Sequence, residues 1–110
     1  MTPTAQPDAV LVLTTLPADA DAAGLGRMLV EERLAACVNL LPVMTSVYRW
    51  KGGIEQDREQ QLVIKTTASR LRDLEARIRE LHPYEVPEFL VIGIAGGSDR
   101  YLDWLGDSVR

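Results

Sequence analysis

The stretch that decides the fold runs over residues 35–67, AACVNLLPVMTSVYRWKGGIEQDREQQLVIKTT. Its arms, residues 36–50 and 54–67, are rich in β-branched and aromatic residues, and the Gly52-Gly53 pair between them can take positive φ, so a long hairpin is predicted. A fully extended 15-residue arm spans about 50 Å, whereas a compact chain of this length is only about 34 Å across. Pro42 cannot donate a ladder hydrogen bond, so we expect a bend or bulge there.

The tip of this hairpin must therefore project from the domain, and its composition is apolar. Tyr48 and Trp50 lie in the tip, and Val47 and Ile54 flank it. An exposed apolar hairpin favours association with other chains unless something covers it. We therefore predict that another copy of the chain covers the tip.

The segments on either side of the hairpin alternate between strand and helix patterns. Apolar runs at residues 10–15 (VLVLTT) and 89–95 (FLVIGIA) predict buried strands. Helices are predicted after the capping residues Asp19 or Asp21, Ser69 and Ser98. The first is expected to run to residue 34, and Pro83 is expected to end the second.

The resulting order is strand, helix, strand, strand, helix, strand and a C-terminal helix. This order predicts an α+β fold, a ferredoxin-like split βαβ sandwich in which two helices cover one face of an antiparallel sheet. Because the runs at residues 10–13 and 89–94 are apolar on both faces, we expect both faces of the sheet to be buried, the second one in an oligomer.

Length and composition restrict the function. The 110 residues fit one domain, expected at residues 9–110 after a flexible N-terminal leader at residues 1–8. The net charge of −4 argues against a nucleic-acid binder. One cysteine excludes an intrachain disulfide framework and a zinc site built from several thiolates of one chain. No apolar run approaches the roughly 18 residues of a membrane span, and no secretory signal pattern is present, so we expect no membrane partner and a cytoplasmic location.

The common catalytic signatures are absent. The sequence contains no Gly-x-Ser-x-Gly, no His-Glu-x-x-His, no glycine-rich phosphate loop and no Cys-x-x-Cys. We therefore expect a protein that is not an enzyme.

Cys37 and His82 are the candidate metal ligands. Cys37 fits either a small buried apolar residue or a thiolate ligand for copper(I) or zinc, for which further donors are needed. His82, the only histidine, lies at the predicted end of a helix, next to the carboxylates Glu85 and Glu88. The segment HPYEVPE (residues 82–88) is therefore either a structural loop or a binding site for a divalent metal or small ligand.

Two further pairs have alternative interpretations. Glu59 and Lys65 are six residues apart on one predicted strand and so share a face, either as a buried ion pair at a subunit junction or in a ligand cleft. Trp50 and Trp104 are either packing anchors or platforms for a ligand.

Several motifs, in order and covering about residues 10–105, resemble the CutA divalent-cation tolerance family. They are LAACVN (34–39), SVYRWKG (46–52), Glu59 with LVIKTT (62–67), HPYEVPE (82–88) and YLDWL (101–105). The resemblance implies a tight homotrimer of ferredoxin-like subunits, similar in architecture to PII signalling proteins, with hairpins that cross into neighbouring subunits. It also implies inter-subunit clefts around His82 and the ligand-cleft residues Trp50, Glu59, Lys65, Tyr84, Glu88, Tyr101 and Trp104. Some relatives carry additional cysteines proposed to hold copper, whereas this chain has only Cys37.

Three functions follow from these observations. The first is a trimeric divalent-cation tolerance protein that responds to or binds a metal such as copper or zinc, with Cys37 and His82 as ligands. The second is a PII-like module that binds a small anionic metabolite in inter-subunit clefts, with Lys65 and arginines supplying positive charge. The third, for which the sequence offers least support, is a hydrolase that uses Glu59 and His82.

Overall fold

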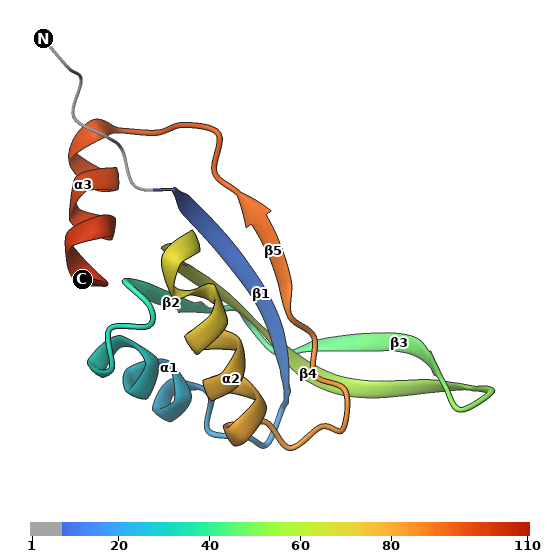
Figure 1. Cartoon of the computed structure of the whole chain (residues 1–110). Coiled ribbons are helices and arrows are strands. Elements are labelled where there is room, and N and C mark those ends of the chain that lie inside the picture. The colour runs from blue at the N-terminus through green and yellow to red at the C-terminus, as the bar shows by residue number, and fades with distance from the viewer. Residues whose placement is uncertain (1–7) are drawn as a thin grey trace, which may run out of the picture.

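The structure is a computed structural model that describes residues 8–110, and it contains one antiparallel sheet packed against helices (Figure 1). The predicted α+β class is therefore confirmed. The predicted leader, apart from Asp8, lies outside the described residues. The elements in chain order are β1 (Ala9–Pro17), α1 (Ala22–Glu31), β2 (Cys37–Leu40), β3 (Met44–Trp50), β4 (Gly53–Thr67), the 3₁₀ turn η1 (Ala68–Arg70), α2 (Leu71–Leu81), β5 (Leu90–Gly93) and α3 (Asp99–Ser108).

The long strand β4 organises the sheet. Its C-terminal half lies between β2 and β1, and β5 pairs with the other edge of β1, which gives the order β2-β4-β1-β5 with antiparallel neighbours. Residues 53–58 of β4 pair only with β3. The register runs from Trp50 opposite Gly53 to Met44 opposite Glu59, which also pairs with Pro17 of β1. One strand therefore joins the body of the domain to the hairpin arm.

The two faces of the sheet have different environments. On one face Val12, Leu62 and Ile64 are fully buried and form the main core with residues of α1 and α2, such as Leu29 and Leu74. Because side chains alternate along a strand, residues 59, 61, 63 and 65 of β4 lie on the opposite face. A smaller cluster attaches α3 to the start of β1 and β2 through its buried residues Leu102, Leu105 and Val109. The predicted site residues of β4 are therefore on the face that α1 and α2 leave open.

The predicted projection of the hairpin is confirmed, because the molecule measures 58 × 25 × 24 Å and the β3–β4 arm extends beyond its body (Figure 1). Residues 41–43 separate β2 from β3, so the break expected at Pro42 is present. The turn differs from the prediction: Lys51 (φ 49°) and Gly52 (φ 81°) take the positive φ values, whereas Gly53 begins β4. Positive φ at both central residues matches the right-handed twist of a two-residue hairpin.

The helix caps were predicted in part. Asp21 caps α1 by accepting a hydrogen bond from the Gly24 N–H, and Ser98 caps α3 in the same way. The first helix ends at Glu31, three residues early, because Arg33 takes a left-handed φ of 59°. Ser69 is not a cap, since it lies within η1 and its hydroxyl pairs with the hydroxyl of Thr67.

The expected burial of the last strand is not found within one chain. β5 is an edge strand, shorter than predicted, and Leu90, Val91 and Ile92 are all exposed. An apolar edge strand with a free hydrogen-bonding side is a surface on which another chain can pair. Among residues 8–110, none of the helices has the length and apolar character that a membrane crossing requires.

Candidate functional site

A cleft of about 630 Å³ opens between the β3–β4 arm and the segment after α2. Its volume falls in the usual range for small-molecule sites. Its lining residues are Thr15, Met44, Ser46, Tyr48, Trp50, Glu59, Gln61 and the segment 83–88 (PYEVPE). The cleft therefore combines three aromatic side chains with three glutamates.

Local structure explains how these side chains meet. The alternation of β3 places Met44, Ser46, Tyr48 and Trp50 on one face, and the register with β4 places Glu59 on that same face. The opposite wall is the segment 83–88, which follows the end of α2 at Leu81. Pro83 and Pro87 restrict the backbone of this segment. A rigid segment is thus held against one face of the arm.

Glu59 and Tyr84 form the central contact of the cleft. The Tyr84 hydroxyl donates to Glu59 Oε2 at 2.6 Å, and only 6% of Glu59 is exposed. Burial, followed by the hydrogen bond to the Glu59 carboxylate, raises the pKa of Tyr84 well above its usual range. Within residues 8–110, no cationic side chain forms an ion pair with Glu59.

A second tyrosine–carboxylate pair lies on the arm. The Tyr48 hydroxyl donates to Asp57, and this hydrogen bond raises the pKa of Tyr48 to about 12. Deeper in the cleft, Gln61 Nε2 donates to Glu88 Oε2 at 2.9 Å and to the Thr14 carbonyl at 2.7 Å. Gln61 thereby attaches the segment after α2 to the sheet.

His82 supports the cleft from behind. Its Nδ1 accepts a hydrogen bond from the Tyr84 N–H at 3.1 Å, so the proton belongs on Nε2, which donates to the Thr15 carbonyl at 2.6 Å. The ring is buried, and its centroid lies 4.8 Å from that of Tyr84. Both ring nitrogens are therefore engaged with backbone groups, and the imidazole fixes the position of Tyr84.

The predicted cleft residues divide into two groups. Trp50, Glu59, Tyr84 and Glu88 line the cleft. The other three, Lys65, Tyr101 and Trp104, lie together near α3: the Lys65 ammonium is 3.4 Å from the Tyr101 hydroxyl, and the Tyr101 and Trp104 rings are 5.2 Å apart.

The predicted metal ligands also lie apart. Cys37 is the register partner of Lys65, whereas His82 bonds to Thr15, which pairs with Gln61 farther along β4. In the described chain, no group of three or more His, Cys, Asp and Glu side chains could hold a metal ion. One protomer therefore does not supply a closed metal site, and Cys37 and His82 do not converge within it.

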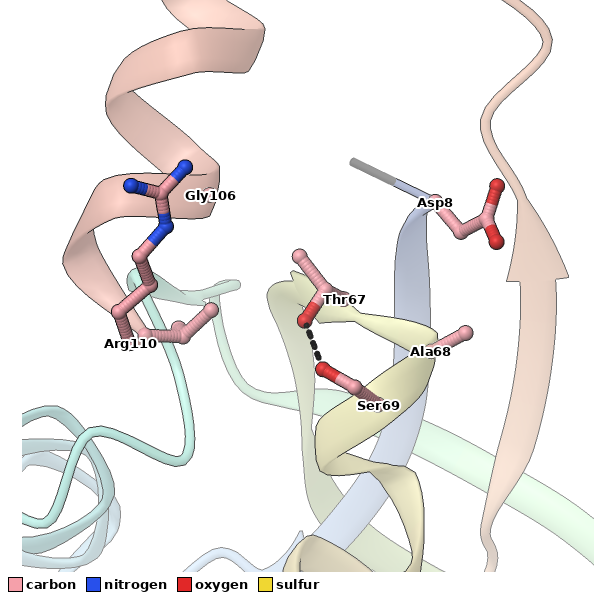
Figure 2. A pocket seen from close by; sticks show the side chains of 7 residues that line it. Asp8, Thr67, Ala68, Ser69, Gly106 and Arg110 are labelled. Carbon is pink, nitrogen blue, oxygen red and sulfur yellow. Dashed lines mark hydrogen bonds between the residues drawn. The ribbon is translucent and has the colours of Figure 1, made fainter. Parts of the chain in front are cut away.

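Sequence reasoning missed five residues that line the cleft, which are Tyr48, Gln61, Thr15, Met44 and Ser46. For the first two a signal was available, because Tyr48 alternates with Trp50 and Gln61 alternates with Glu59. A smaller hollow of about 200 Å³ lies between η1 and the end of α3, and none of the predicted cleft residues or metal ligands lines it (Figure 2). There the Thr67 and Ser69 hydroxyls pair with each other, and Asp8 and Arg110 lie at the margin (Figure 2).

Comparison with known proteins identifies relatives of this chain. The family model for the CutA1 divalent ion tolerance protein matches residues 10–108. The divalent-cation tolerance protein CutA of Thermus thermophilus is 47% identical over 98 residues, which cover 89% of this chain and 95% of that protein. CutA of Pectobacterium atrosepticum is 47% identical over 94% of each chain.

Solved structures give the same result. The divalent cation tolerance protein (CutA1) from Thermus thermophilus superposes with a TM-score of 0.89 at 45% identity, covering 93% of this chain and 99% of that one. CutA1 from Oryza sativa superposes with a TM-score of 0.91 at 38% identity, covering 96% of both chains.

Proposed function

Because this chain belongs to the CutA1 divalent ion tolerance family, we propose that it serves divalent-cation tolerance as a cytoplasmic, non-enzymatic homotrimer of ferredoxin-like subunits that responds to or binds metal ions. The observation that carries the proposal is the amount of apolar surface that one chain leaves uncovered. Val47 and Ile54 on the arm are 65% and 64% exposed, and β5 exposes Leu90, Val91 and Ile92.

The position of this surface supports assembly. The arm accounts for the 58 Å length of a domain that is 25 Å wide, so the chain's own core cannot reach its tip. Monomeric proteins rarely leave large amounts of apolar surface in water, and β5, on the body of the domain, adds an edge with unpaired backbone groups. The family resemblance supplies the stoichiometry of three copies.

The metal-binding part of the proposal places the site between copies. Each protomer contributes one thiol, Cys37, which is partly exposed, and a soft thiolate suits copper(I) or zinc. His82 has no free ring nitrogen in this structure. Direct binding therefore needs donors from more than one chain, and the acidic cleft lies on a different part of the subunit.

The mass in solution tests the assembly. Light scattering on the eluted protein should give about 37 kDa, three times the chain mass of 12.2 kDa, and a value near 12.2 kDa would reject the trimer. Calorimetric titration with copper and zinc tests metal binding, with Cys37→Ala as the variant that should lose heat and His82→Ala as the comparison. No heat at micromolar metal in the wild-type protein would contradict direct binding and leave only an indirect response.

The cleft favours a second candidate function, that of a PII-like module that binds a small ligand. Its volume suits a ligand of several heavy atoms. Its charge, however, argues against the anionic metabolite that the sequence suggested, because its lining contains three glutamates and no lysine or arginine. Lys65, the predicted source of positive charge, lies beside Tyr101 instead. A thermal-shift screen of cationic, neutral and anionic small molecules tests this function, because a ligand that binds only the folded state raises the melting temperature.

A further inference from the structure

The cleft between the arm and residues 83–88 has an unusual chemical lining. Tyr48, Trp50 and Tyr84 contribute aromatic rings, and Glu59 lies among them. Aromatic faces carry negative electrostatic potential and attract cations, most strongly where water is excluded. The lining therefore provides a negative charge and π-faces in one concave surface.

Glu59 lacks a counter-charge. Only 6% of Glu59 is exposed, and its side-chain hydrogen-bond partner is the neutral Tyr84 phenol. No ion pair among residues 8–110 includes Glu59. A buried carboxylate is costly unless it is paired with a cation or fully hydrogen-bonded, and one phenol satisfies only part of its acceptor capacity. A cationic ligand in the cleft can therefore pair with the Glu59 carboxylate.

A bare metal ion suits this site poorly. Hard divalent ions need several oxygen donors around one point, whereas no group of three candidate ligands converges within residues 8–110. The Glu88 carboxylate is engaged by Gln61. An organic ammonium ion needs one carboxylate and surrounding aromatic faces, and its carbon substituents fill a volume that a metal ion leaves empty.

The rim of the cleft contains an example of this recognition. The Lys51 ammonium lies 5.6 Å from the centroid of the Trp50 ring and 3.9 Å from Glu85 Oε2. The arm thus already pairs an alkylammonium with an indole face and a carboxylate, although at a solvent-exposed position.

We propose that the cleft binds an organic ammonium ion, with Glu59 as its counter-charge and Tyr48, Trp50 and Tyr84 as its walls. This inference deepens the second candidate function, because it names the ligand class of that cleft. It requires neither the trimer nor a metal, since the named side chains all come from one chain.

Choline and its neutral carbon isostere, 3,3-dimethylbutan-1-ol, form the matched pair of probes. The Trp104→Phe variant leaves Trp50 as the only tryptophan, so its fluorescence reports on the cleft. Choline should change this fluorescence saturably and the isostere should not. Glu59→Gln, which keeps the shape and an acceptor for Tyr84, should raise the choline Kd at least about tenfold. Glu31→Gln, an exposed carboxylate on α1, is the control and should leave the Kd unchanged.

Three results would overturn the proposal. The first is equal binding of choline and its isostere. The second is an unchanged choline Kd in a Glu59→Gln variant whose circular dichroism spectrum is native. The third is binding of zinc chloride that depends on Glu59, without binding of choline. If Glu59→Gln does not fold, Trp50→Leu replaces it, and calorimetry in place of fluorescence must then show weakened choline binding. The mass of each sample is measured in parallel, so failure of the trimer and failure of the ligand assignment give different results.

Discussion

Substitution of Ile54 by serine tests whether other copies cover the hairpin arm. Ile54 is 64% exposed in one chain, so about two-thirds of the roughly 2–3 kcal/mol gained by burying an isoleucine remains available to an interface, or about 1.5–2 kcal/mol. Because a homotrimer contains three copies, the substitution should weaken assembly by about 5 kcal/mol per trimer. This corresponds to a decrease of roughly three to four orders of magnitude in the association constant.

Sedimentation velocity over a dilution series measures this loss, and guanidinium unfolding at several protein concentrations extends the range if the wild-type trimer does not dissociate. Gln56→Ala is the matched control, because Gln56 lies two residues away on the same face of β4 and is also exposed. It should change stability by less than about 0.5 kcal/mol. Equal dissociation of Ile54→Ser, Gln56→Ala and wild type would refute the inference that the exposed arm is an interface.

Three further substitutions or titrations test individual contacts. His82→Leu should lower the free energy of unfolding by about 2–4 kcal/mol in chemical denaturation, since two backbone groups lose their partner; a smaller loss would mean that water replaces the imidazole. The folded-state pKa values of Tyr48 and Tyr84 are raised, so their contribution to stability is present below pH 10 and should be lost as pH rises through about 12 for Tyr48 and higher for Tyr84. Absorbance at about 295 nm should show both phenols ionising late, and ionisation of all three tyrosines near pH 10 would contradict these contacts. Asp21→Ala should cost about 1 kcal/mol through loss of the cap, whereas Asp19→Ala should cost much less by the same thermal or chemical measurement.

The hairpin could be predicted because its determinants are local. Alternation, the break at Pro42 and the glycines near residue 52 each act within a few residues. The exposure of β5 could not be predicted in the same way, because an apolar run has the same sequence whether its own chain or another chain covers it. That another copy covers the run stays a prediction, and the described chain itself does not provide the cover.

The candidate site was predicted less completely for a geometric reason. Alternation gives the face of a strand on which a residue lies, but not which distant segment packs there. Glu59 and Lys65 share a face of β4, yet six residues at about 3.3 Å each separate them by about 20 Å. They consequently belong to different surroundings, with Glu59 beside Tyr84 and Lys65 beside Tyr101.

The arm assigns its two faces to two different tasks. On β3, Tyr48 and Trp50 line the cleft, so the alternating residue Val47 lies on the opposite face, and the register places Ile54 with it. A neighbouring copy can therefore cover Val47 and Ile54 without filling the cleft. Assembly and ligand binding then depend on the same element but on different side chains, with Tyr48 and Trp50 on one face of the arm and Val47 and Ile54 on the other.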